Sequence, residues 1–316
     1  MIPEHMSEYA IGVDLGGTNL RAAAIDHAGT LLEKISAPTN YREGREAVLG
    51  DIVSAIDQLR AKYGTEGLSG IGVGVPGFIR VNEGVITNSN NLPYLENVPV
   101  RDELTRRLGA RVILENDANA AALGEKWMGA GRDVEDLVLL TLGTGVGGGI
   151  ISSGRVLRGH VGMAGEFGHT TVVPTGNPCG CGNQGCLEKH ASATAVTAMA
   201  RLMQLGENLT AQQVCELARE QSEAGEKART IWRVFGEALG LTLATLINVF
   251  NFPLYLLSGG VLPAWEFFAP HMERVAQQRS FTYRATLAET RIAPAALGNA
   301  AGLFGAAYLP WLEAAR

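Results

Sequence analysis

The chain has 316 residues, a length at which single hydrophobic cores usually stop growing, so we expect two lobes. Hydrophobic residues make up 46%, charged residues 18%, and the 40 glycines are spread among apolar runs, which argues against a disordered chain. The formal charge is −6 and no cluster of five or more Lys and Arg occurs, which argues against a nucleic-acid binder.

Sequence features at the start of the chain and in its apolar runs predict a cytoplasmic protein with no membrane partner. We find no apolar stretch of the roughly 18 residues that a membrane span needs. Residues 1–8 (MIPEHMSE) lack the basic and apolar regions of a signal peptide. Three of the four cysteines cluster at 179–186, while Cys215 stands alone. Without an export signal, clustered thiols indicate metal ligands before disulfides.

In chain order, two apolar runs around a Gly-Gly-Thr turn predict a β-hairpin over 9–26. Apolar residues at helical spacing predict a helix over 45–63, followed by a strand over 71–75. A second glycine-rich hairpin over 137–152 suggests two related lobes. The later expected elements are helices over 193–202, 231–250 and 300–312 and a buried strand over 254–257. This alternation predicts an α/β protein.

The two hairpin turns read DLGGT at 14–18 and GTGVGGG at 143–149. Glycine lets the backbone approach a ligand closely, and successive exposed N–H groups suit phosphate oxygens. Neither turn ends in the Lys-Ser/Thr of a Walker loop or leads directly into a helix as a dinucleotide fingerprint does. Each could be a tight turn with no ligand. Their paired occurrence, with a carboxylate in the first and threonines in both, favours phosphate binding.

The segment ENDANAA at 115–121 follows an expected strand over 111–114 and opens an Ala-rich helix. Asp117 taken alone could be a helix N-cap that accepts otherwise unpaired backbone amides. Its position at the carboxyl end of a strand favours a ligand contact, because ligands of α/β folds gather there.

The cysteine cluster has a histidine partner ten residues upstream. His169, Cys179, Cys181 and Cys186 form a set of three thiolates and one imidazole, which is typical of a structural zinc site. The alternative is a reduced thiol cluster with an unrelated histidine. A closed set of four ligands also argues against metal-activated water.

Two glutamates, Glu166 and Glu188, flank the expected zinc ligands. Such carboxylates could be solvated surface groups, the usual state of glutamate. A polyhydroxylated ligand, however, needs acceptors that are held rigidly in different directions, and a zinc site would hold its flanking residues rigidly.

Six segments, distributed in order along nearly the whole chain, match the motifs of a known family. They are DLGGT (14–18), GVPG (74–77), ENDAN (115–119), LGTGVGGG (142–149), EFGH (166–169) and CGCGNQGCLE (179–188). Together they resemble the ROK family of sugar kinases and repressors, and the match looks closest to bacterial ROK glucokinases. The cysteine motif that ends in glutamate is the most specific of the six.

The resemblance implies an actin-like ATPase (ribonuclease H-like) fold, with two α/β lobes around a cleft for nucleotide and sugar. The small lobe would hold residues 1–117 and 299–316, and the large lobe residues 118–298 with the zinc loop. The implied reaction is ATP-dependent phosphorylation of a hexose at its 6-hydroxyl, with glucose as the first candidate. ATP, Mg²⁺ and a structural Zn²⁺ are the implied cofactors, and a homodimer or homotetramer is the implied assembly.

The resemblance also assigns site residues, among which Asp117 would be the base that activates the sugar hydroxyl and His169 would serve both zinc and sugar. The phosphates of ATP would lie near Asp14, Gly16, Gly17, Thr18, Gly143, Thr144 and Gly145, and the nucleoside near Ser258, Gly259 and Gly260. The sugar would contact Asn116, Asp117, Glu166, His169 and Glu188, with Gly77 and Asn91 as further contacts. At the segment NLPY (91–94) many relatives carry a tryptophan shortly after the Asn-Leu pair.

Two other functions stay open at this point. One is an N-acetylhexosamine kinase, acting on N-acetylmannosamine or N-acetylglucosamine, since acylated sugars use the same acidic contacts. The other is a sugar-responsive regulator. Family repressors carry a DNA-binding helix-turn-helix before the first glycine turn, and the eight residues that precede Tyr9 leave no room for one.

Overall fold

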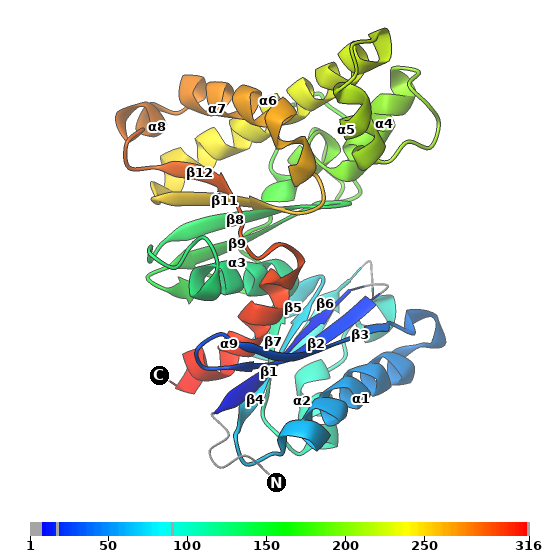
Figure 1. Cartoon of the computed structure of the whole chain (residues 1–316), viewed down its shortest axis with the longest axis vertical. Coiled ribbons are helices and arrows are strands. Elements are labelled where there is room, and N and C mark those ends of the chain that lie inside the picture. Colours follow the sequence, from blue (N-terminus) through cyan, green and yellow to red (C-terminus); the bar gives the residue numbers. More distant parts are fainter. Residues whose placement is uncertain (1–7, 17–18, 90–91, 315–316) are drawn as a thin grey trace. The chain divides into compact units, whose positions relative to one another are not determined.

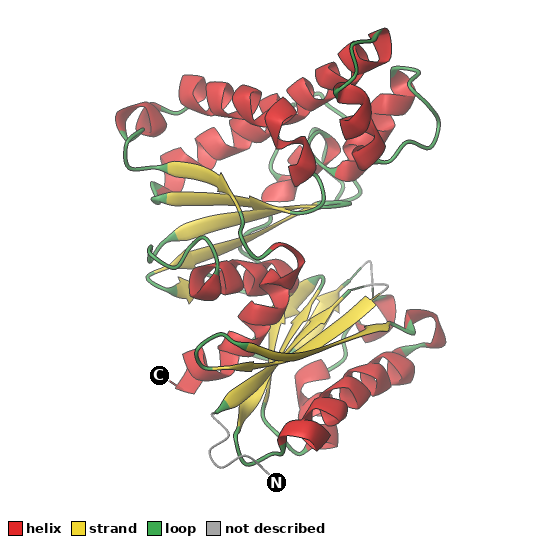
Figure 2. Cartoon of the chain, viewed as in Figure 1, coloured by secondary structure: helices red, strands yellow, loops and turns green. Residues whose placement is uncertain are grey.

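The computed structural model describes residues 8–16, 19–89 and 92–314. Helices and strands alternate along the chain (Figure 1, Figure 2), as expected for an α/β protein. The strands are β1 Tyr9–Leu15, β2 Asn19–Asp26, β3 Leu31–Pro38, β4 Leu68–Val75, β5 Phe78–Arg80, β6 Val85–Asn88, β7 Val112–Asn116, β8 Leu137–Leu142, β9 Val146–Ser152, β10 Arg155–Val156, β11 Leu254–Ser258 and β12 Arg291–Pro294. The helices are α1 Arg45–Tyr63, α2 Val100–Leu108, α3 Asp117–Met128, α4 Ala193–Leu202, α5 Ala211–Ala218, α6 Glu223–Phe250, α7 Trp265–Arg279, α8 Phe281–Ala285 and α9 Ala301–Ala314.

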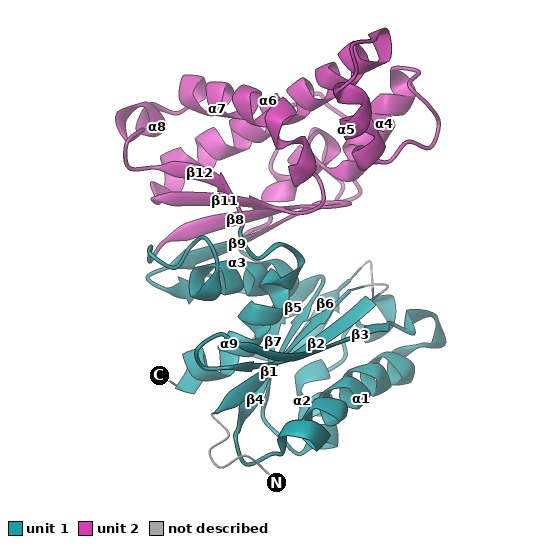
Figure 3. Cartoon of the chain, viewed as in Figure 1, with its two compact units in different colours: residues 1–135, 149–164, 296–316 teal, residues 136–148, 165–295 magenta. Residues whose placement is uncertain are grey.

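The chain packs as two compact units (Figure 3). The first unit comprises residues 1–135, 149–164 and 296–316, and the second comprises residues 136–148 and 165–295. The lobe boundaries expected from the sequence, after residues 117 and 298, stay a prediction, because a functional lobe and a packing unit are different divisions of a chain.

The first unit is built on a sheet with the strand order β3-β2-β1-β4-β7. β1 pairs antiparallel with β2 and parallel with β4, and β7 is parallel to β4. Successive β1 side chains point to opposite faces. Ile11 and Val13 are buried in a cluster that includes Ile52 of α1 and Leu104 of α2, whereas Ala10 packs in another cluster with α9. Both faces of the sheet are therefore covered.

Helix α9 lies at backbone distance from the sheet because glycines stand beneath it. A Cβ on Gly12 of β1 would overlap the carbonyl oxygen of Leu303, and a Cβ on Gly72 of β4 would overlap that of Ala306. Only the missing side chain allows this close approach. The C-terminal helix is therefore an integral layer of the first unit.

The second sheet has the order β10-β9-β8-β11-β12, with β8, β11 and β12 parallel. In the second unit, helices gather beside β8, β11 and β12 (Figure 2). Helix α6 begins at Glu223, earlier than expected, because the Ser222 side chain caps it by accepting from the N–H of Gly225. It is long and apolar enough to cross a membrane, but 56% of its most apolar window is buried, which is typical of a core helix.

Candidate active site

The first glycine turn places a carboxylate at the carboxyl end of β1. Asp14 pairs in register with Gly74 of β4, which pairs in turn with Glu115 of β7. Asp14 therefore lies at the same sheet edge as the β7–α3 junction, where ligands of α/β folds bind. Burial raises the pKa of Asp14, and Arg21, with its Nη1 3.4 Å from the carboxylate, and Lys34 partly oppose this. The same Arg21 nitrogen donates to the carbonyl of Asn299 at 2.8 Å.

At the β7–α3 junction, the helix cap is Asn116 and not Asp117. The Asn116 Oδ1 accepts from the N–H groups of Ala118 at 2.9 Å and Asn119 at 3.1 Å. Its Nδ2 donates to the carbonyl of Gly77 at 3.2 Å, which joins two of the predicted sugar-binding residues. Asp117 is the first helical residue, where a negative charge is favoured by the helix dipole. Its Oδ1 also accepts from the N–H of Ala118 at 2.8 Å, so Asp117 adds to the capping without being the N-cap residue.

Next to this junction lies the carboxylate of Glu115, for which the sequence predicted no role. Glu115 is fully buried, and its Oε2 lies 2.7 Å from both Nε and Nη2 of Arg158. The Oε1 accepts from the Asn116 N–H at 3.1 Å and the Asn119 Nδ2 at 3.2 Å. Arg158 is 43 positions away, so no local sequence pattern could have indicated this pair.

The second glycine turn connects β8 to β9 and is tied to the start of α4. The carbonyl of Gly143 accepts from the N–H of Ala193 at 2.8 Å, and that of Thr144 accepts from the Thr194 hydroxyl at 2.7 Å. With its carbonyls engaged in this way, the turn has a fixed conformation, as a phosphate cradle requires.

The glycines that follow β11 lie beside this second turn. Gly259 has a φ of +109°, and a Cβ there would overlap the carbonyl of Leu142, the residue before Gly143. Ser258 is buried, with its hydroxyl 3.5 Å from the carbonyl of Leu140. The structure thus brings together two of the segments predicted to bind ATP, Gly143–Gly145 and Ser258–Gly260.

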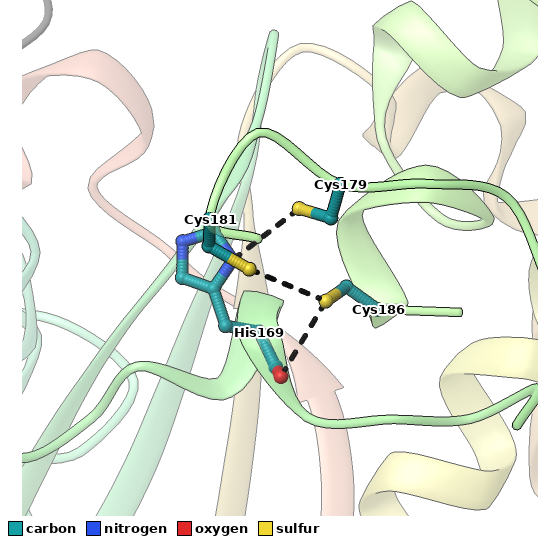
Figure 4. Close-up of side chains that lie close together, drawn as sticks. All are labelled: His169, Cys179, Cys181 and Cys186. Atoms are coloured by element: carbon teal, nitrogen blue, oxygen red, sulfur yellow. Dashed lines mark hydrogen bonds between the residues drawn. The ribbon is translucent and has the colours of Figure 1, made fainter. Parts of the chain in front are cut away.

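Three cysteines and a histidine converge in the loop between β10 and α4 (Figure 4). Their ligand atoms all lie within 4.8 Å of one another. The Cys179 Sγ is 3.7 Å from His169 Nδ1, and the Cys181 and Cys186 sulfurs are 3.7 Å apart. A tetrahedral zinc site with Zn–S bonds of about 2.3 Å separates its ligands by about 3.8 Å, so the donor set and spacing fit this ion.

Two acidic residues, Glu166 and Glu188, lie near the cysteine–histidine cluster. His169 turns its Nδ1 toward Cys179, and its Nε2 lies 4.0 Å from the Glu166 carboxylate. Burial raises the pKa of Glu166, which His169 opposes and the charge of Glu188 reinforces. The Glu188 Oε2 in turn accepts from the backbone N–H of Val146 at 3.0 Å, directly after the second glycine turn. Glu166, His169 and Glu188 therefore form one group in the second unit.

The residues predicted to bind ATP, sugar or zinc belong to both units. Three of them, Gly17, Thr18 and Asn91, lie outside the described residues. The first unit contributes Asp14, Gly16, Gly77, Asn116 and Asp117. The second contributes Gly143, Thr144, Gly145, Glu166, His169, Cys179, Cys181, Cys186, Glu188, Ser258, Gly259 and Gly260. The structure brings residues together within each group, and their roles toward ligands stay predictions.

Comparisons with known proteins identify relatives of this chain. The model of the ROK family matches residues 10–312. The chain is 37% identical to a glucokinase of Halalkalibacterium halodurans, over 95% of this chain and 94% of the other. It is also 33% identical to a xylose repressor of Caldicellulosiruptor bescii, over 86% of this chain and 70% of the repressor.

Solved structures show the same similarity. A ROK hexokinase of Thermus thermophilus has a TM-score of 0.84 at 35% identity, covering 97% of this chain and 99% of the other. A ROK glucokinase of Streptomyces griseus, solved with glucose and AMPPNP, has a TM-score of 0.78 at 31% identity, covering 95% and 98%. The chain belongs to the ROK family and has the actin-like ATPase fold expected from its sequence.

Proposed function

We propose that this chain is an ATP-dependent hexokinase that phosphorylates glucose at its 6-hydroxyl. The observation that carries the proposal is the position of Asp117, which stands beside the helix cap Asn116 at the carboxyl edge of the first sheet. Phosphoryl transfer asks a protein mainly for alignment, charge neutralisation and a group that accepts the proton of the attacking hydroxyl. Asp117 supplies that group in our proposal.

The two glycine turns hold ATP in this proposal. We assign the phosphates of ATP to Asp14, Gly16, Gly17, Thr18, Gly143, Thr144 and Gly145, and the nucleoside to Ser258, Gly259 and Gly260. Asp14 contributes negative charge near the site of the hydrated Mg²⁺, which keeps several waters and binds mainly through the phosphates. The support for the second half of this site is the packing of Gly259 against Leu142, next to the turn.

In this proposal the sugar contacts Asn116, Asp117, Glu166, His169 and Glu188. Gly77 and Asn91 make further contacts. A Zn²⁺ held by His169 Nδ1 and the three cysteines serves structure alone, because its four ligands leave no open position. One observation supports the proposed contact of His169 with the sugar. Its Nε2 lies 4.0 Å from the Glu166 carboxylate, and this nitrogen carries an N–H donor when Nδ1 binds the metal.

The test of the base is Asp117→Asn, which keeps the side-chain shape and removes the proton acceptor. We expect kcat to fall about 10²- to 10⁴-fold, while glucose binding measured by calorimetric titration stays within a few-fold of normal. Near-normal turnover in this variant would overturn the assignment.

The alternative substrate is an N-acetylhexosamine, which requires room around the second carbon of the sugar. A coupled ADP-release assay with glucose, mannose, fructose, N-acetylglucosamine and N-acetylmannosamine distinguishes these acceptors by kcat/KM. A preference for an acetylated sugar would replace glucose as the substrate and keep the reaction class.

The similarity to a xylose repressor makes DNA binding the rival from another class. A gel-shift experiment at physiological salt tests it, and sequence-specific retardation together with absent kinase activity would favour the regulator. We further propose a cytoplasmic homodimer or homotetramer, to be measured by light scattering on the purified chain.

A further inference from the structure

We infer that the buried ion pair of Glu115 and Arg158 is a positioning device for Asp117, and that Arg158 is thereby a positioning residue for phosphoryl transfer. This inference rests on the proposed function. Its basis is the set of contacts that the Glu115 carboxylate makes, which converge on the turn that carries Asp117.

Glu115 is completely buried, so its charge needs compensation. Arg158 provides it through two donors on one carboxylate oxygen, with Nε and Nη2 each 2.7 Å from Oε2. The hydrogen bond from Nε and the ion-pair contact of Nη2, both from one planar guanidinium, hold this carboxylate oxygen in place. Glu115 is thus held from the segment that follows β10.

The second oxygen of Glu115 transmits this position to the junction. Oε1 accepts from the backbone N–H of Asn116 and from Nδ2 of Asn119, the residues on either side of Asp117 and Ala118. Asn116 then caps the helix through Ala118 and Asn119. Asp117 therefore lies in a segment whose flanking residues are both fixed by one carboxylate.

A purely structural ion pair would support the fold without acting on Asp117. The structural role and the positioning role predict different effects of a substitution on stability, kcat and KM. A structural role predicts lower stability with normal kinetics in the folded fraction. A positioning role predicts a lower kcat with a small change in the KM for glucose, because a misplacement of about 1 Å at a reacting group can cost about 10²-fold.

The experiment compares Arg158→Lys with Arg60→Lys as a matched control. Both arginine side chains are 20% exposed in the first unit, and Arg60 donates to the carbonyl of Leu108, away from the junction. We expect Arg158→Lys to lower kcat about ten- to hundredfold while the control stays within twofold. Equal kcat values for the two variants, measured on folded protein, would overturn the inference.

A double-mutant cycle of Arg158→Lys with Asp117→Asn measures the coupling between the two substitutions in kcat. A purely structural role of Arg158 would give no coupling. If Arg158 acts through Asp117, then Arg158→Lys costs little further activity once the carboxylate of Asp117 is gone. Multiplicative losses would contradict the inference. Glucose titration of the unaltered chain separates the two proposals, since a chain that neither binds nor phosphorylates glucose refutes the proposed function and the inference with it.

Discussion

The carboxylate of Glu188 accepts a hydrogen bond from the backbone N–H of Val146 at 3.0 Å. A residue proposed to bind the sugar is thus anchored to the turn proposed to bind the phosphates. Gly145 permits this contact, because a Cβ there would overlap the Glu188 Oε2. The two proposed binding functions therefore share one hydrogen bond.

Gly145→Ala tests this link. We expect the added methyl group to displace Glu188 and to raise the KM for glucose about ten- to hundredfold, since a lost hydrogen bond to a charged group costs about 1.5–3 kcal/mol. Steady-state kinetics with glucose and ATP varied in turn measures the effect. The control is Gly50→Ala in α1, because no heavy atom of the described residues lies within 4 Å of a Cβ built there. An unchanged KM for glucose would show that the contact is dispensable.

Removal of metal by a strong chelator should raise the KM for glucose and lower the melting temperature. The reason is that His169 and the flanking glutamates lose their common support when the four ligands separate. Metal content by mass spectrometry and kinetics on the same sample give the comparison.

The matched substitutions are Cys181→Ser, which removes a ligand of the cluster, and Cys215→Ser, whose thiol donates to the carbonyl of Pro263 outside it. We expect the first to lose zinc and the second to keep it. Retention of one zinc per chain by Cys181→Ser would contradict the assigned ligand set.

The pH dependence of stability should reveal the partly buried carboxyl group of Asp14. Its folded pKa is raised above 3.8 by burial, so the folded state keeps this proton longer than the unfolded state does. Stability is therefore lost as the pH rises from about 3.8 through the raised pKa. Asp14→Asn abolishes this loss, and the difference in melting temperature between variant and parent should grow from about pH 4 to about pH 7.

The exposed Asp133 provides the comparison. For Asp133→Asn, the difference in melting temperature from the parent should not change with pH. A gain in stability at neutral pH together with loss of kinase activity is the expected combination for Asp14→Asn. If the difference in melting temperature between Asp14→Asn and the parent shrinks as the pH rises, burial is not the dominant influence on the pKa of Asp14.

Gly72→Ala should weaken the packing of α9 on the first sheet. Its Cβ would overlap the carbonyl of Ala306, so the helix must move away. Overpacking of this kind costs about 1–3 kcal/mol, which denaturant unfolding resolves. The Gly50→Ala variant is the control, and it should itself gain about 0.5–1 kcal/mol because Ala is favoured inside a helix. A stability of Gly72→Ala at or above that of the unaltered chain would mean that the sheet and helix can separate without cost.

Much of the fold could be predicted from local patterns. Helical spacing predicted 45–63, the bounds of α1, and 193–202, the bounds of α4. Glycine turns between apolar runs predicted the β1–β2 and β8–β9 hairpins. Helix α6 starts eight residues before the expected 231, because its first turns are marked by the cap Ser222 and not by apolar spacing.

The candidate site was predictable where its chemistry lies in one short segment, as in the cysteine cluster. Tertiary contacts were not. The sequence left Asp117 open as a helix cap, and the structure gives the N-cap position to Asn116, while the Asp117 Oδ1 shares the N–H of Ala118 with it. The Arg158–Glu115 pair and the Arg21–Asn299 contact join residues 43 and 278 positions apart, a separation at which a single sequence carries no pairing signal.

The position of α9 on β1 and β4 has a consequence for synthesis. The strands emerge from the ribosome before Leu303 and Ala306, which follow the whole second unit in the chain. Until then, the part of the sheet face around Gly12 and Gly72 lacks the helix α9 that packs on it, and these contacts of long sequence separation form last. The first unit therefore completes its core only after the whole second unit has been translated, so a nascent chain stalled before α9 would present an open, aggregation-prone apolar surface.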